Sequence, residues 1–175
     1  MRKLALNELD RPNYGTYQTK PKYPIVVILD NIRSMYNVGA VFRTADAFLI
    51  QGLYLCGITA TPPHREIQKT AIGATQSVAW EYRESVAEAC ETVKAQGYQL
   101  VGVEQTDESQ PLHQFPINAE HGYALVMGNE VEGLQDDVLP LLNAAVEIPQ
   151  FGTKHSLNIA VSSGIALWHF VEGYL

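Results

Sequence analysis

The first of three polar segments able to do chemistry is Asn37-x-Gly39-x-x-x-Arg43, which follows the apolar run "IVVIL". Asn37 is a favourable N-cap, so we expect a helix to begin there. The guanidinium of Arg43 binds carboxylate or phosphate through paired donors. An ordinary alternative is a surface arginine paired with Asp46, three residues further on. Arg43 lies one position past Phe42, at the edge of the apolar stripe of this helix, which comprises Val38, Phe42, Ala45 and Leu49.

The second segment, Gly128-Asn129-Glu130-Val131-Glu132-Gly133-Leu134, follows the apolar run "YALVM". Ligands of open α/β sheets bind in loops at the carboxyl ends of strands. Glycines at its two ends would let the backbone approach a ligand closely. The alternative is a plain polar turn.

The third segment, "IPQFGTKHSLN", runs from Ile148 to Asn158 and joins a strand end to the last helix. On an ordinary reading Ser156 caps that helix, so Ser156 alone says little. The combination of three such segments, each between a strand and a helix, favours one functional site.

Strand and helix patterns alternate along the chain, which predicts an α/β fold with a mostly parallel sheet flanked by helices. The runs "IVVIL" and "YALVMG" are continuously apolar, as expected of central strands covered on both faces. The expected strands are 25–29, 52–57, 77–82, 99–104, 123–128 and 145–148, and the expected helices are 38–49, 65–72, 84–96, 136–143 and 157–172.

The last expected helix, "LNIAVSSGIALWHFVEGYL", is apolar almost all round, and Ser162, Ser163 and Gly164 form a small-residue patch. One face of a sheet cannot cover such a helix. It is therefore either threaded into its own domain or packed against another subunit, and a plain buried helix is the simpler alternative.

Charge divides the chain into a basic N-terminal arm, 1–23, and a domain, 24–175. The chain has 12 basic and 19 acidic residues, for a net charge of −7. Five of the basic residues precede position 25: Arg2, Lys3, Arg11, Lys20 and Lys22. The acidic body argues against indiscriminate nucleic-acid binding, which depends on Lys and Arg.

Several classes of protein are excluded by what the sequence lacks. Cys56 and Cys90 are far apart and outside any C-x-x-C spacing, so we expect no disulfide framework and no metal site. No apolar run is long enough for a signal peptide or a membrane span, which predicts a cytoplasmic protein with no membrane partner. Without a G-x-G-x-x-G motif, a dinucleotide-dependent oxidoreductase is not expected.

The motifs N-x-G-x-x-x-R, G-N-E-x-x-G-L and I-P-x-x-G-x-x-x-S-L-N, in this order, resemble those of the SpoU family of RNA ribose 2′-O-methyltransferases in the SPOUT superfamily. The resemblance covers roughly residues 24–172. It implies methylation of a ribose 2′-hydroxyl of tRNA or rRNA, S-adenosyl-L-methionine as methyl donor, a homodimer and a C-terminal trefoil knot. Gln150 departs from the family pattern, which commonly has methionine there.

The resemblance also implies roles for individual residues. The reaction site would comprise Asn37, Arg43, Glu130, Ser156 and Asn158. Cofactor contacts, mainly through the backbone, would come from Val103, Glu104, Gly128, Ile148 and Leu157. The family's proposed base is the arginine, but a guanidinium is effectively always protonated. We therefore expect Arg43 to clamp the phosphate beside the target ribose and to stabilise the developing alkoxide, with Glu130 orienting it, and the role of base is the alternative for Arg43.

Three other functions remain open at this point. A non-catalytic RNA-binding module of the same fold would have no affinity for the cofactor. A SPOUT methyltransferase acting on a base would not usually carry the first and third motifs. A small-molecule methyltransferase would suit the acidic body.

Overall fold

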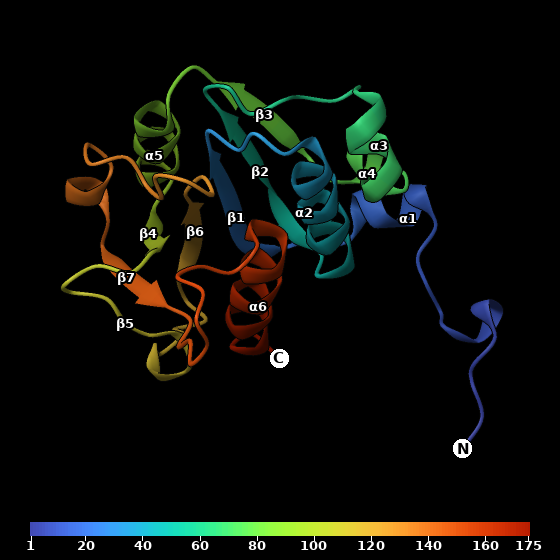
Figure 1. Cartoon of the computed structure of the whole chain (residues 1–175). Coiled ribbons are helices and arrows are strands. Elements are labelled where there is room, and N and C mark those ends of the chain that lie inside the picture. The colour runs from blue at the N-terminus through green and yellow to red at the C-terminus, as the bar shows by residue number, and fades with distance from the viewer.

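The computed structural model describes residues 1–175, except for the side chain of Leu6. Seven strands form one sheet in the order β3-β2-β1-β6-β4-β7-β5, and every neighbouring pair is parallel (Figure 1). This confirms the expected α/β class. The strands are β1 Tyr23–Asp30, β2 Ile50–Cys56, β3 Trp80–Arg83, β4 Tyr98–Val103, β5 Gln110–Pro111, β6 Gly122–Met127 and β7 Ala144–Glu147.

The two continuously apolar strands are central, as the sequence predicts. β1 lies between β2 and β6, and β6 lies between β1 and β4. Alternate residues of β1 enter two separate cores: Ile25 and Val27 belong to one, Val26 and Ile28 to the other. Both faces of these strands are therefore covered, which explains why their sequences do not alternate.

Helices cover both faces of the sheet (Figure 1). Residues of α2 and α6 pack in the core on one face, and residues of α5 pack in the core on the other. The helices are α1 Tyr14–Thr19, α2 Met35–Ala47, α3 Arg65–Ala71, α4 Ala74–Ser77, α5 Val86–Ala95 and α6 Ile159–Glu172, with 3-10 turns at Leu6–Glu8, Leu112–Gln114 and Leu139–Leu141.

Both helices that carry motif residues begin at a cap other than the expected one. The Ser34 side chain caps α2 by accepting from the Asn37 N–H at 3.3 Å, so Asn37 lies in the first turn. The expectation that Asn37 is the N-cap was wrong. Asn158 caps α6 by accepting from the Ala160 N–H at 2.9 Å, so the ordinary reading of Ser156 as a cap was also wrong. The side chains of Asn37 and Ser156 therefore do not cap a helix.

The helix expected over 136–143 is absent from the described chain, where only the turn Leu139–Leu141 forms. Pro140 has no N–H to continue a helix, and successive bonds reach back three residues, as from Leu141 N–H to Val138 C=O at 2.9 Å. The strand expected over 77–82 begins only at Trp80, because α4 occupies 74–77.

The helix α6 is apolar on two sides, and only one faces the domain. Ser163, Ala166, Leu167 and Phe170 are buried. Val161, Ile165 and Trp168 form a second stripe that is 51%, 41% and 48% exposed, respectively. The Trp168 ring packs on Phe48, with ring centroids 5.8 Å apart.

The N-terminal arm contacts the body through α1. Tyr17 is buried, and the Gln18 side chain donates to the Ser77 carbonyl at 3.0 Å. Leu4 and Leu9 are exposed, and the Leu6 side chain lies outside the described residues. Hydrophobic anchoring of the arm therefore comes from Tyr17.

Candidate active site

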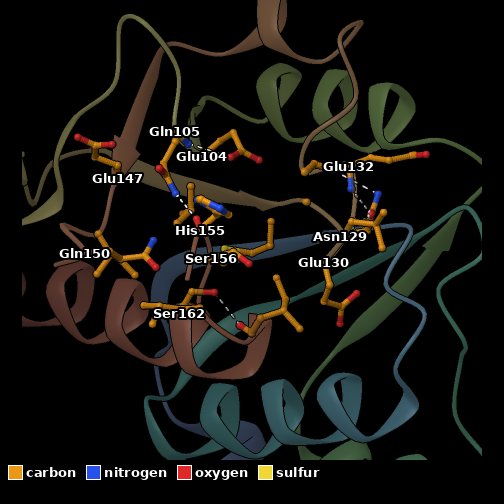
Figure 2. Close-up of a pocket in the computed structure, with 18 of the residues that line it drawn as sticks. Glu104, Gln105, Asn129, Glu130, Glu132, Glu147, Gln150, His155, Ser156 and Ser162 are labelled. Atoms are coloured by element: carbon orange, nitrogen blue, oxygen red, sulfur yellow. Dashed lines mark hydrogen bonds between the residues drawn. The ribbon is translucent and has the colours of Figure 1, made fainter. Parts of the chain in front are cut away.

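A cavity of about 390 Å³ opens at the carboxyl ends of β4, β6 and β7 (Figure 2). Its lining includes all five residues expected to contact a cofactor, namely Val103, Glu104, Gly128, Ile148 and Leu157. Parallel strands end at the same edge of a sheet, which is why segments distant in sequence meet here. Glu130 and Ser156, from the second and third motifs, also line it.

The loop of the second motif closes tightly on itself. Asn129 and Gly133 exchange two backbone hydrogen bonds of 3.1 Å each. The Asn129 side chain accepts from the N–H groups of Val131 and Glu132 at 3.0 and 2.9 Å. Gly133 has φ +71°, a left-handed conformation that favours glycine. The closed loop leaves Glu130 exposed beside the cavity.

The Glu104 side chain holds this loop against the end of β4. One carboxylate oxygen accepts from the Leu134 N–H at 3.0 Å, and the other accepts from the Gln105 N–H at 2.8 Å. The sequence suggested mainly backbone contacts to a cofactor for Glu104, so this structural role of its carboxylate was missed. The sequence feature that could have indicated this role is an acidic residue at the end of an apolar strand.

The loop of the third motif is tied to the same strand end. The Gln105 side-chain amide donates to the His155 carbonyl at 2.9 Å (Figure 2). Within the described chain, the backbone groups of Ile148 and Leu157 form no hydrogen bond with other backbone groups or with side chains. These two cavity-lining residues can therefore offer donors and acceptors to a ligand.

A chain of hydrogen bonds links one residue from each motif. Asn158 donates from its side-chain amide to Asn37 Oδ1 at 3.1 Å, and Asn37 Nδ2 donates to Glu130 Oε1 at 2.7 Å. These bonds join α6, α2 and the second-motif loop, which are 121 and 93 residues apart in sequence. Four of the five predicted reaction-site residues are thus gathered at or beside the cavity.

Arg43 is the exception, because it lies apart from this chain of bonds. Six residues beyond Asn37, it points about 240° around the helix. Its side chain is exposed, and it forms no hydrogen bond or ion pair with any described residue. Asp46 instead accepts a hydrogen bond from Ser77, so the ordinary pairing of Arg43 with Asp46 is not formed. Glu130 binds Asn37, so the expected orienting bond from Glu130 to Arg43 is not formed either.

A buried carboxylate, Asp30, lies at the end of β1 and was not singled out from the sequence. Burial raises the pKa of this carboxyl, whereas hydrogen bonds from the Gln135 N–H at 3.4 Å and the Asn31 amide at 2.8 Å lower it. Asp30 thereby ties β1 to the segment that follows the second motif.

The described residues form neither a metal site nor a membrane span. Among the described residues, no group of three or more His, Cys, Asp or Glu side chains is arranged to hold a metal ion. Within the same residues, no helix combines the length and the apolar character needed to cross a membrane.

A parallel sheet with loops of the second and third motifs around a cavity at its carboxyl edge is typical of α/β proteins that bind a ligand there. The family model of the SpoU rRNA Methylase family matches residues 24–168. The chain belongs to this family, which confirms the resemblance seen in the motifs.

Named relatives modify RNA. The 23S rRNA (guanosine-2′-O-)-methyltransferase RlmB of Neisseria meningitidis is 31% identical over 144 residues, 82% of this chain and 56% of the relative. The tRNA (guanosine(18)-2′-O)-methyltransferase of Aquifex aeolicus is 29% identical over 155 residues, 85% of this chain and 69% of that protein. The chain thus spans about half the length of the first relative.

Solved structures share the fold. The SpoU methyltransferase AviRb of Streptomyces viridochromogenes, in complex with the cofactor AdoMet, superposes with a TM-score of 0.78 at 25% identity, covering 89% of this chain and 62% of that one. A structure described as giving insights into the 2-OH methylation of C/U34 on tRNA superposes with a TM-score of 0.71 at 25% identity, covering 86% and 93% of the two chains.

Proposed function

We propose that this chain is an S-adenosylmethionine-dependent methyltransferase that methylates a ribose 2′-hydroxyl of tRNA or rRNA. The observation that carries the proposal is the hydrogen-bond chain Asn158–Asn37–Glu130, which joins all three family motifs beside one cavity. The names of the relatives and membership of the family support the same reaction.

The cavity suits the methyl donor in size and charge. Its volume of about 390 Å³ falls within the range of small-molecule sites. Its lining includes Glu104, Glu130, Glu132 and Glu147 but, among the described residues, no lysine or arginine. A negative lining attracts a cationic sulfonium and repels a phosphate. When bound, this cofactor supplies a methyl group that an oxygen nucleophile can attack.

The chain's own residues would bind and orient the two reactants. The free backbone groups of Ile148 and Leu157 would hydrogen-bond the cofactor. Ser156, at the cavity rim, would hydrogen-bond the ribose hydroxyl, and Asn37 with Asn158 would fix the loops around it. Such placement converts an encounter into an oriented reaction.

We further propose that the chain forms a homodimer through α6. The exposed stripe Val161, Ile165 and Trp168 on α6 is apolar, and it would be covered in such a dimer. We expect sedimentation to give about twice the 19.4 kDa chain mass, and Trp168→Glu to shift it towards the monomer. A wild-type monomer at micromolar concentration would contradict the dimer. The trefoil knot stays a prediction.

Transfer RNA and ribosomal RNA are both substrates to test, because the names of the relatives and of the solved structures include enzymes that act on each. We also infer a cytoplasmic location, because Cys56 and Cys90 are free thiols, which are typical of a reducing compartment.

Two measurements test the proposed function. Calorimetry should detect binding of S-adenosylmethionine or its demethylated product at micromolar concentration. Radioactive methyl groups should then enter tRNA or rRNA from a strain lacking the gene, and the modified position should resist alkaline hydrolysis because its 2′-oxygen is blocked. Absence of cofactor binding would favour the non-catalytic RNA module, and cofactor binding without RNA labelling would favour a small-molecule substrate.

A further inference from the structure

Methylation of a hydroxyl releases a proton, and the motif residues offer no good acceptor for it. The guanidinium of Arg43 is effectively always protonated. Asn37, Ser156 and Asn158 carry amide or hydroxyl groups, which are not bases near neutral pH. If the proposed function holds, the chain therefore needs another group close to Ser156.

Two of the four carboxylates at the cavity are already engaged. Glu104 accepts from two backbone N–H groups, and Glu130 accepts from Asn37. Glu132 and Glu147 also line the cavity. An ordinary imidazole, however, is about a hundredfold more basic than an ordinary glutamate carboxylate, so imidazole is the better acceptor at neutral pH.

His155 supplies an imidazole directly before Ser156, and it lines the cavity (Figure 2). Its backbone position is fixed by the 2.9 Å bond that its carbonyl accepts from the Gln105 side chain. Lys154 precedes it on an exposed loop and is absent from the lining.

The other four histidines have different surroundings. His64 caps α3, and His169 contacts the Phe115 carbonyl at 2.9 Å. His113 and His121 are exposed and do not belong to the lining of this cavity. Of the histidines in the described chain, His155 alone lines it.

We propose that His155 is the proton acceptor for the ribose 2′-hydroxyl that becomes methylated. An imidazole nitrogen takes the hydroxyl proton, and the O–H electron pair remains on the oxygen. This oxygen bonds to the methyl carbon as the methyl–sulfur bond breaks, and the electrons of that bond neutralise the sulfonium. The imidazolium then returns its proton to water. The inference rests on the proposed function.

The test compares wild type with His155→Gln and with the matched control His113→Gln, using the RNA that wild type labels. Single-turnover rates should fall at least about 100-fold in His155→Gln, as for loss of a general base, and should be unchanged in the control. The wild-type rate should decline on the acid side of neutrality, and this decline should be missing in His155→Gln. Free imidazole should partly restore the rate of His155→Ala.

Two further measurements do not depend on turnover. Calorimetric affinities of S-adenosylhomocysteine and RNA should remain within threefold in His155→Gln, which also shows that the variant is folded. RNA with S-adenosylhomocysteine should slow carbethoxylation of His155 by diethyl pyrocarbonate, followed by mass spectrometry, but not that of His113.

A His155→Gln variant with the wild-type rate and pH profile would overturn the inference while leaving the proposed function intact. Loss of cofactor affinity, or carbethoxylation that RNA leaves unchanged, would also overturn it, because His155 would then act in binding or lie away from the substrate. A wild-type protein that makes no 2′-O-methylribose would remove both the function and the inference.

Discussion

Replacing Gly128 by alanine tests whether the loop of the second motif must close tightly for the site to form. A Cβ at position 128 would lie closer than 3.0 Å to the backbone of Gly133 and Leu134. Backbone atoms cannot rotate away as a side chain can, so the loop would have to open. Gly152, on the neighbouring loop, is the matched control, because a Cβ there would meet nothing within 4 Å.

The expected loss of stability follows from the bonds that an open loop gives up. The two 3.1 Å bonds between Asn129 and Gly133 would break, and the 3.0 Å bond from Leu134 to Glu104 would weaken. At about 1 kcal/mol per bond, with about 1 kcal/mol for overpacking, the free energy of unfolding should fall by about 3 kcal/mol. For a domain of this size, Tm should fall by about 6–12 °C.

Urea unfolding followed by circular dichroism measures this difference directly. Gly152→Ala should stay within about 0.5 kcal/mol of wild type. Since Gly128 lines the cavity, Gly128→Ala should also weaken cofactor binding at least tenfold by calorimetry. If both variants unfold at the same urea concentration as wild type, close packing of this loop does not stabilise the domain and the reasoning fails.

Three other perturbations test separate parts of the molecule. Arg43→Ala should lower the methylation rate at least about 100-fold with cofactor affinity unchanged, and Arg43→Lys should recover only part, because an ammonium lacks the planar fork; full activity would make Arg43 an ordinary surface residue. Burial raises the pKa of Asp30 above 3.8. Its contribution to the free energy of unfolding is therefore present below that pH and lost as pH rises through the folded-state pKa. The free energy of unfolding of Asp30→Asn relative to wild type, measured in urea, should accordingly increase from about pH 4 to 7. Deleting residues 1–12 should lower the log–log salt slope of RNA binding by about 0.7–0.9 per lost phosphate contact. Tm should not change, because the deletion keeps the buried Tyr17. An unchanged slope would show that residues 1–12 do not contact RNA phosphates.

Much of the architecture could be predicted because strand burial leaves a direct trace in sequence. The runs 25–29 and 123–128 are continuously apolar, and both strands proved to be central. Parallel strands carry their following loops to one edge, so three motifs after three strands were expected to converge. The second and third motifs do line one cavity, and Asn37 of the first is hydrogen-bonded to both, as topology predicts without any knowledge of side-chain positions.

Side-chain partners were harder to predict, because several are chosen by tertiary contacts. Asn37 has the right type for an N-cap, yet Ser34 takes that position and leaves Asn37 to bridge Asn158 and Glu130. The segment 136–143 has helical apolar spacing, but Pro140 limits it to a short turn. Local pattern indicated where an element lies more reliably than what its polar residues bind.

Electrostatics assigns the two proposed ligands to different surfaces. A cavity lined by four glutamates favours a cationic methyl donor and repels the phosphates of RNA. The body from residue 25 onward carries 17 acidic and 7 basic residues, so its overall charge cannot hold RNA either. RNA phosphates must therefore be met by local cations such as the exposed Arg43. The ribose alone needs to enter the cavity rim, where Ser156 and His155 lie side by side. Salt should accordingly weaken RNA binding with a shallow log–log slope, of about 0.7–0.9 for each of these few phosphate contacts.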